Sequence, residues 1–356
     1  MTDRRGVTVV NVTSPSYTGT TWLCLLLGSH ARAFTLGPPD RVWSMRADPE
    51  RAGREACRVH GEACGFWPSF FAQYDASRNF YVQLGAFSGR DVIVINNPTP
   101  AHVAAELQDP ALTVRPLEMI RDARALATSY ARHHRVDVYD AIVDFAQHLP
   151  RSFAWSPDRE DVLGLRYEDL MSDPRGHVAR FASFVGLDYD ERALAFWEFD
   201  HHITSGNQGT IALLKFFQGL PVPNFRNRAF YEAQFDRMRK GEAAFDDQRW
   251  QDELGARERF VFDHFCGAAN AAWGYEPDRF TTAEREQFLA ELREAGRSMR
   301  PASTRGWRVA ARHVKARASA ATAALGRSQR RRLAAVGIVW FVSLVLVWII
   351  AAVVYG

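Results

Sequence analysis

The residues best placed to do chemistry lie near the N-terminus, in the segment SPSYTGTTW, Ser14–Trp22. The apolar run Val7–Thr13 before it predicts a buried strand, and Thr20–Ser29 predicts a helix. A glycine-containing turn between a strand and a helix offers backbone N–H groups and the positive end of the helix dipole to an anion. The segment therefore predicts a cradle for a phosphate or sulfate group, with a tight turn that binds nothing as the alternative. Gly19 is followed by threonine and not lysine, which argues against an ordinary P-loop kinase or ATPase.

A second polar constellation lies in EMIRDARALATSYARHH, Glu118–His134. Arg121 stands where a predicted strand ends, and Ser129 follows eight residues later in a predicted helix. A guanidinium group suits a phosphate because it donates two hydrogen bonds in one plane, and a nearby serine can complete the pocket. The alternative is an ion pair of Arg121 with Asp122 or Glu118.

Taken together, these two segments resemble the sulfotransferase superfamily, in particular its bacterial members. LRYEDLMSDPRGHVARFASFVGL, Leu165–Leu187, resembles the family's Tyr-Glu-Asp-Leu segment, and HHITSGNQG, His201–Gly209, resembles a later His-x-x-x-Gly-Asn segment. The resemblance covers about Val7 to Tyr275. It implies a P-loop-like fold that binds the donor 3′-phosphoadenosine 5′-phosphosulfate.

The resemblance also implies a set of donor-binding residues. The first loop would hold the 5′-phosphosulfate, Arg121 and Ser129 would hold the 3′-phosphate, and Tyr167 would approach the nucleotide. The implied donor-binding residues are Tyr17, Thr18, Gly19, Thr20, Thr21, Trp22, Arg121, Ser129 and Tyr167.

The residues expected to carry out catalysis depart from the family pattern. Many members place a lysine where this chain has Tyr17, and related bacterial members carry a Gly-Glu pair and an Asp-Ser-Ser-Lys segment where this chain has TLGPPD and INNPT. Asp40 is the nearest acidic replacement for the missing glutamate, and His30 is a second candidate base. Each has a structural alternative, since Asp40 is suited to capping a turn and His30 to a helix C-terminus. Arg41 and Arg124 are candidates for the missing positive charge.

Cysteine and histidine give no clear metal site. Cys57, His60 and Cys64 cluster in CRVHGEAC, but the sequence shows no good candidate for the fourth ligand of a zinc site. We therefore expect no metal, and read these cysteines as free thiols or as one loop-closing bridge. The pairs His133–His134 and His201–His202 are interpreted as acceptor-pocket or surface groups, because neighbouring residues on a helix point in different directions.

The elements that must position these residues alternate between strand and helix. This pattern predicts an α/β fold with a central parallel sheet flanked by helices, followed by a helical C-terminal part. Predicted strands are 7–13, 33–36, 91–95, 112–120 and 162–167, and the main predicted helices are 20–29, 100–107, 122–134, 136–153 and 174–185.

The end of the chain has a different composition. Leu333–Tyr355 is a run of 23 uncharged, mostly apolar residues, long enough as a helix to span a bilayer core of about 30 Å. Arg330–Arg332 precede it, so the positive-inside rule predicts a single-pass tail anchor that leaves the N-terminal body in the cytoplasm. The expected organisation is an α/β domain at 1–280, a basic helical stalk at 281–332 and a transmembrane helix at 333–355.

These features favour a membrane-anchored sulfotransferase that uses 3′-phosphoadenosine 5′-phosphosulfate without a metal. Its acceptor would be a hydroxyl group, for which a membrane-associated glycan or lipid is considered, and no nucleic acid partner is expected. The alternative is a catalytically impaired nucleotide-binding module recruited to a membrane complex. The unmatched Glu and Lys positions favour the module, and the intact loops favour the enzyme.

Overall fold

The computed structural model describes residues 6–152, 159–242 and 245–299. Within these residues, five parallel strands form one sheet in the order β2-β3-β1-β4-β5. The strands are β1 (Val7–Thr13), β2 (Ala33–Gly37), β3 (Val92–Asn96), β4 (Leu112–Ile120) and β5 (Leu163–Arg166). The parallel α/β sheet predicted from the sequence is therefore confirmed. The strand order reverses direction at β1, and in open α/β sheets ligands bind outside the carboxyl ends of the strands at such a switch point.

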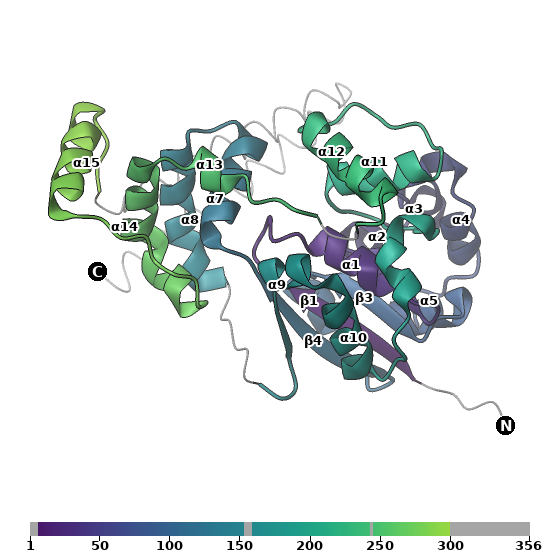
Figure 1. Ribbon diagram of the computed structural model, residues 1–356. Helices are drawn as coiled ribbons and strands as arrows, with labels where there is room; N and C mark the ends of the chain where they lie inside the picture. The colour runs from purple at the N-terminus through teal and green to yellow at the C-terminus, as the bar shows by residue number, and fades with distance from the viewer. Residues whose placement is uncertain (1–5, 153–158, 243–244, 300–356) are drawn as a thin grey trace, which may run out of the picture. The chain divides into compact units, whose positions relative to one another are not determined.

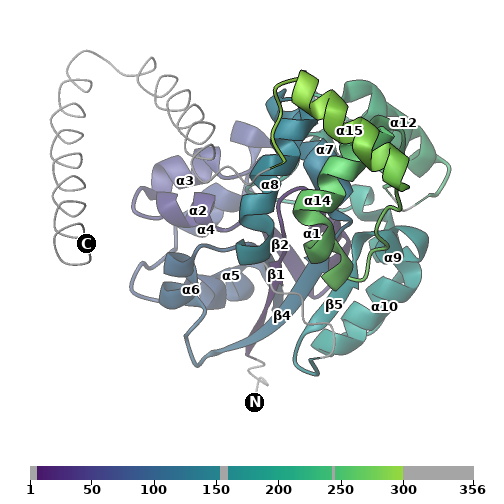
Figure 2. The ribbon, with the colours of Figure 1, turned by 90° about the vertical axis from the view of Figure 1, so that its left-hand side faces the viewer.

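Helices lie on both faces of this sheet (Figures 1 and 2). Figure 2 shows α5 (Phe80–Ser88) and α6 (Pro100–Glu106) on one side, and α9 (Tyr167–Ser172) and α10 (Pro174–Val185) on the other. The helix α1 (Thr20–Gly28) has its whole stretch Trp22–Leu27 buried. This burial holds the loop before α1 firmly against the core.

The remaining elements extend the fold at its two flanks. Near α1 and β2 lie α2 (Asp40–Met45), α3 (Pro49–Glu55), the 3₁₀ segment η1 (Gly61–Ala63), α4 (Phe66–Phe71), the 3₁₀ segment η2 (Glu191–Glu198), α11 (Gln208–Phe217) and α12 (Arg228–Arg239). The segment Phe66–Phe87, which the sequence left unassigned, thus forms α4 and most of α5 around a buried group of aromatic rings.

A second apolar cluster surrounds α7 (Ala123–His134), α8 (Val138–Ser152) and α14 (Ala256–Ala272). The short helix α13 (Trp250–Glu253) and α15 (Thr282–Glu294) complete this part, and α15 buries Phe288 and Leu292 against the cluster. The first compact unit of the chain runs to Met299. The stalk from 300 onward and the proposed transmembrane helix 333–355 lie outside the described residues.

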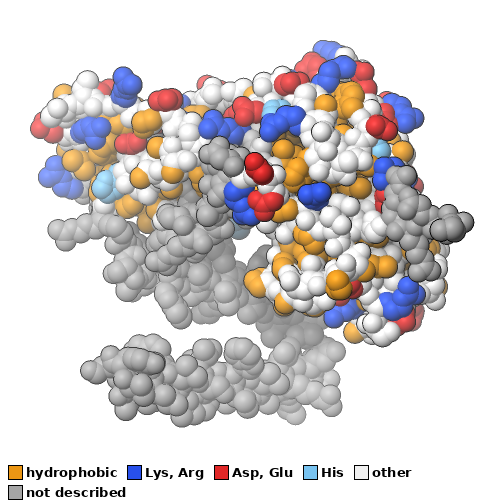
Figure 3. Space-filling model, turned by 90° about the horizontal axis from the view of Figure 1, so that it is seen from below, with side chains coloured by type: hydrophobic (Ala, Val, Ile, Leu, Met, Phe, Trp, Pro, Cys, Tyr) orange, Lys and Arg blue, Asp and Glu red, His pale blue; other side chains and the backbone are white. Residues whose placement is uncertain are grey.

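Tyr189 and Leu289 are the large hydrophobic side chains that the described residues leave exposed. Basic and acidic side chains are interspersed on the face seen in Figure 3. No helix among the described residues has both the length and the apolar character needed to cross a membrane.

Candidate functional site

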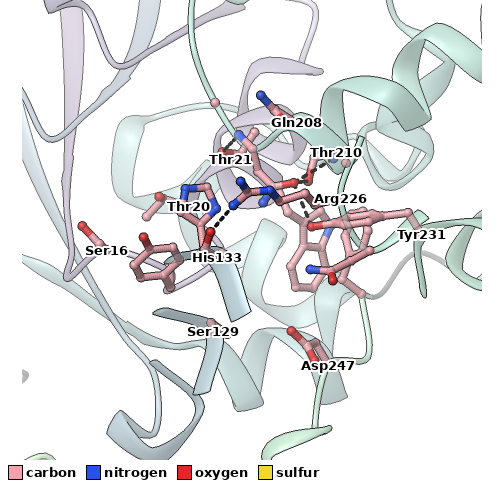
Figure 4. A pocket seen from close by; sticks show the side chains of 18 of the residues that line it. Ser16, Thr20, Thr21, Ser129, His133, Gln208, Thr210, Arg226, Tyr231 and Asp247 are labelled. Carbon is pink, nitrogen blue, oxygen red and sulfur yellow. Dashed lines mark hydrogen bonds between the residues drawn. The ribbon is translucent and has the colours of Figure 1, made fainter. Parts of the chain in front are cut away.

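A cavity of about 540 Å³ opens at the carboxyl edge of the sheet (Figure 4). Each of the five strands is followed closely by a residue that lines the cavity wall. These residues are Ser16 after β1, Pro38 after β2, Asn97 after β3, Arg121 after β4 and Tyr167 after β5. The parallel sheet thus brings together residues that are far apart in the sequence.

The loop before α1 forms one part of this wall. Tyr17 and Gly19 both have positive φ angles, 72° and 98°, so the backbone turns sharply before the helix begins. The Ser14 N–H donates to Asn97 Oδ1 at 2.9 Å, which ties the loop to the end of β3. The first two N–H groups of α1 have no acceptor within the helix, and its first turn holds no acidic residue. This helix N-terminus is therefore suited to bind an anion.

Gly19 has a second constraint besides its backbone angle. A Cβ atom built on Gly19 would lie 2.8 Å from a carbon of the Tyr167 ring. Tyr167 is itself fixed, because its hydroxyl donates to the Phe245 carbonyl at 2.6 Å and its ring packs edge-on against Trp22. The close approach of loop and ring leaves room only for glycine.

We therefore expect Gly19→Ala to lower the free energy of unfolding by about 2–4 kcal/mol, because left-handed strain adds to steric overlap. Gly89→Ala is the matched control. Gly89 also has a positive φ, 66°, but its added Cβ would contact nothing within 4 Å, so only the strain of about 1–2 kcal/mol applies. Urea unfolding of both variants measures the difference, and equal losses would show that the Tyr167 contact is unimportant.

A second helix N-terminus lines the cavity. Asn207 caps α11, accepting from the Thr210 N–H at 3.0 Å, and its own N–H donates to Thr21 Oγ1 at 2.9 Å. The Tyr231 hydroxyl donates to the same Asn207 Oδ1 at 2.8 Å. Gly206 lies so close to α1 that an added Cβ would stand 2.8 Å from Thr21. The His-x-x-x-Gly-Asn segment thus joins α11 directly to the first loop.

On another part of the cavity wall, guanidinium groups gather around one carboxylate. Arg121 and Arg132 form ion pairs with Asp247 at 3.4 and 3.9 Å, and Arg249 Nε donates to it at 2.7 Å. Burial acts to raise the pKa of Asp247, but the hydrogen bond from Arg249 and the charges of the three guanidinium groups lower it to about 2. Arg132 also donates to Ser129 Oγ at 2.9 Å. Ser129 and Asp247 both lie in the lower part of Figure 4, whereas Thr21 and Thr210 lie in its upper part.

The side chains that line the cavity carry a net positive charge. Among the described residues, the lining includes four arginines, the fourth being Arg226, but a single carboxylate and no lysine. The excess of positive charge in a partly enclosed space attracts anions. Arg121 is almost completely buried and stacks over the Tyr167 ring at 4.1 Å. The indole N–H of Trp22 finds no hydrogen-bond partner among the described residues.

His133 is the histidine that lines the cavity. Its carbonyl accepts a hydrogen bond from Arg226, as Figure 4 shows. Burial, and then the charge of Arg226, lower the pKa of His133 below its ordinary value of 6.5. The imidazole is therefore neutral near pH 7 and able to accept a proton.

The fold brings together most of the donor-binding residues that the sequence predicted. Eight of the nine residues line the cavity, and Thr18 does not. Thr18 is fully buried, and its hydroxyl donates to the Pro15 carbonyl at 2.7 Å. Its side chain therefore shapes the turn.

The two candidate bases lie outside the cavity lining. Asp40 accepts from the N–H and the hydroxyl of Thr99, the residue that caps α6. His30 Nδ1 accepts from the Arg32 N–H at 3.0 Å, and the ring faces a small apolar recess beside α10. His30 thus lies just beyond the C-terminus of α1, as its structural alternative expected, whereas Asp40 is the first residue of α2 and is bound to the start of α6. Arg41 and Arg124 do not line the cavity either, and Arg124 is held by Asp122 and Asp278.

Sequence reasoning missed several cavity residues. Arg226, Asp247 and Arg249 come from the region after α11, for which only irregular helical structure was expected. The alternation of basic and acidic residues in RMRKGEAAFDDQRW, 237–250, is the one local signal that could have singled out part of this set. This charge pattern does not indicate near which strands of the sheet these residues lie in the folded protein.

Comparison with known proteins adds the following. No family model and no curated protein matches the sequence. Among solved structures, the sulfotransferase domain of the Synechococcus PCC 7002 olefin synthase is 16% identical, with a TM-score of 0.40, and the match covers 67% of this chain and 96% of that one. The mouse sulfotransferase SULT7A1 complexed with PAP is 12% identical, with a TM-score of 0.42 and coverage of 77% and 90%.

The sulfotransferase STF1 from Mycobacterium tuberculosis H37Rv is 17% identical, with a TM-score of 0.32 and coverage of 61% and 78%. At these identities and TM-scores the similarity carries no argument about the reaction or ligand of this chain. These three solved structures are named as sulfotransferases or as a sulfotransferase domain.

Proposed function

We propose that this chain is a sulfotransferase that takes its sulfuryl group from 3′-phosphoadenosine 5′-phosphosulfate. The observation that carries the proposal is one cavity with two groups of residues suited to bind an anion. The N-termini of α1 and α11 form one group, and Arg121, Arg132 and Ser129 form the other. The donor carries anionic groups at both its 5′ and 3′ positions, so a single molecule would match both groups.

In this reaction the acceptor hydroxyl oxygen attacks the sulfur atom, and the bond from sulfur to the 5′-phosphate oxygen breaks. The acceptor proton passes to a base, and 3′-phosphoadenosine 5′-phosphate leaves. The N–H groups of α1, with the hydroxyls of Thr20 and Thr21, would stabilise the charge that develops on the leaving phosphate. His133 is our candidate base, because it lines the cavity and its lowered pKa keeps it neutral.

A labelled-donor assay tests this proposal. Membrane extract of the source cell, mixed with donor labelled in its sulfate group, is expected to yield a labelled product only when the protein is added. The alternative, a nucleotide-binding module without catalysis, is favoured by one observation. In the part of the chain that the structure describes, the cavity lining has no lysine or glutamate, and its single carboxylate is paired with arginines. Binding of the nucleotide without any transfer would support that alternative.

The location of the protein remains a proposal from sequence. We infer that 333–355 anchor the chain in the membrane with the N-terminal body in the cytoplasm, where a lipid-linked acceptor would reach the cavity. The full chain is expected in the membrane fraction after cell lysis, and a chain ending at Met299, where the first compact unit ends, in the supernatant. The finding of both in the supernatant would exclude the anchor.

A further inference from the structure

Away from the cavity, four side chains with metal-binding atoms meet. Cys57 follows α3, His60 and Cys64 flank η1, and His202 arrives from the segment between η2 and α11. Their ligand atoms all lie within 4.8 Å of one another. His202 is thus the fourth ligand that the sequence did not reveal, and the expectation of no metal site was drawn without it.

The distances between these atoms match those of a tetrahedral zinc site. Cys57 Sγ lies 3.4 Å from His60 Nδ1, and Cys64 Sγ lies 3.4 Å from His202 Nδ1. With Zn–S bonds of about 2.3 Å and Zn–N bonds of about 2.0 Å, tetrahedral geometry places sulfur and nitrogen ligands about 3.5 Å apart. Two cysteines and two histidines are also a usual ligand set for structural zinc.

Asp200 supplies the outer contacts that such a site needs. Its carboxylate lies 3.1 Å from His60 Nε2 and 3.5 Å from His202 Nε2. A carboxylate at Nε2 holds the proton on that nitrogen and leaves the Nδ1 lone pair for a metal. The exposed Asp200 carboxylate thus orients both imidazole rings with Nδ1 directed to the cysteine sulfur atoms.

The surrounding chain holds the four ligands in place. The His60 N–H points to Cys57 Sγ at 3.3 Å, and the His202 ring stacks on Phe66 at 4.6 Å. Trp67 Nε1 donates to the His202 carbonyl at 2.9 Å. Both sulfur-bearing residues are buried, and both histidines are mostly so.

We propose that Cys57, His60, Cys64 and His202 bind one structural zinc ion. Four protein ligands fill the tetrahedral shell and leave no position for a substrate. The ion would join the α3–α4 region to the segment that continues through Ser205, Gly206 and Asn207 into the cavity wall. Its role is to fix that wall, and the proposal does not depend on which reaction the cavity performs.

Metal analysis of the full chain, purified under reducing conditions, tests the site. We expect one zinc per chain, and loss of that zinc in Cys64→Ser. Cys266→Ala is the matched control, because it also removes one buried thiol but belongs to the separate cluster around α14, and it should keep the zinc. Cobalt substitution gives an independent readout, since tetrahedral cobalt with thiolate ligands has characteristic visible absorption bands.

Asp200→Asn tests the outer contact without removing a ligand, and Asp200 is exposed enough for the fold to tolerate the change. We expect zinc affinity, measured by competition with a chelator, to fall 10- to 100-fold. The proposal is overturned if the wild-type chain takes up no zinc, if Cys64→Ser keeps a full equivalent, or if mass spectrometry shows Cys57 and Cys64 joined in a disulfide.

Discussion

Arg121→Ala is expected to weaken binding of 3′-phosphoadenosine 5′-phosphate by about 2–4 kcal/mol, or roughly 30- to 1,000-fold. The reason is that Arg121 is buried at the end of β4 with its guanidinium on the cavity wall, where it donates to a phosphate without first losing much solvent contact. Arg121→Lys should recover only part of the affinity, because lysine keeps the charge but not the planar pair of donors. Calorimetry measures all three proteins.

Arg115→Ala is the control for this series. Arg115 lies on the same strand but is exposed and contacts Phe184, so its loss should leave the affinity unchanged. Because Arg121 also pairs with Asp247, the fold of each variant is checked by thermal unfolding. A folded Arg121→Ala protein that binds the nucleotide as tightly as wild type would remove Arg121 from the site.

His133→Ala is expected to lower kcat by about 10²- to 10⁴-fold while changing nucleotide affinity little, because a general base acts in the transition state. Asp40→Asn is the paired variant. Asp40 accepts hydrogen bonds from Thr99, the N-cap residue of α6, and does not line the cavity, so kcat should stay near the wild-type value. Single-turnover kinetics with labelled donor separates the chemical step from binding.

The pH dependence gives a second readout for His133. A base must be deprotonated, so kcat should fall as pH drops through the histidine pKa. Burial and the Arg226 charge lower that pKa, so activity should persist below pH 6.5 before it declines. If His133→Ala keeps full turnover and Asp40→Asn loses it, the sequence-based choice of Asp40 is restored and His133 is excluded.

The sequence predicted those parts of the molecule that local pattern determines. Val7–Thr13 and Leu112–Ile120 were correctly predicted as strands, because an apolar run bounded by turn residues has few other stable forms. Arg121 could be found because it stands where a predicted strand ends, whereas Tyr167 was assigned only through the resemblance to the sulfotransferase superfamily.

Residues brought in by long-range packing could not be found this way. Asp247 meets Arg121 across 126 positions, and His202 meets Cys64 across 138. Neither contact has a local signature, because both depend on where the segments after η2 and α12 return to the sheet. Asp40 and His30 are titratable residues close in sequence to the predicted site, but neither lines the cavity. Their side chains instead accept hydrogen bonds from Thr99 and from the Arg32 N–H, respectively.

The central claim is that one cavity binds both phosphate-bearing ends of the donor nucleotide. Calorimetry of the wild-type protein with 3′-phosphoadenosine 5′-phosphate and with adenosine 5′-phosphate tests it most directly, because the two ligands differ only at the 3′ position. We expect the ligand with the 3′-phosphate to bind more tightly by about 2–4 kcal/mol, through its charge-assisted hydrogen bonds to the arginine side chains of the cavity. Equal affinities for the two nucleotides would contradict the assignment of Arg121, Arg132 and Ser129 to a 3′-phosphate site.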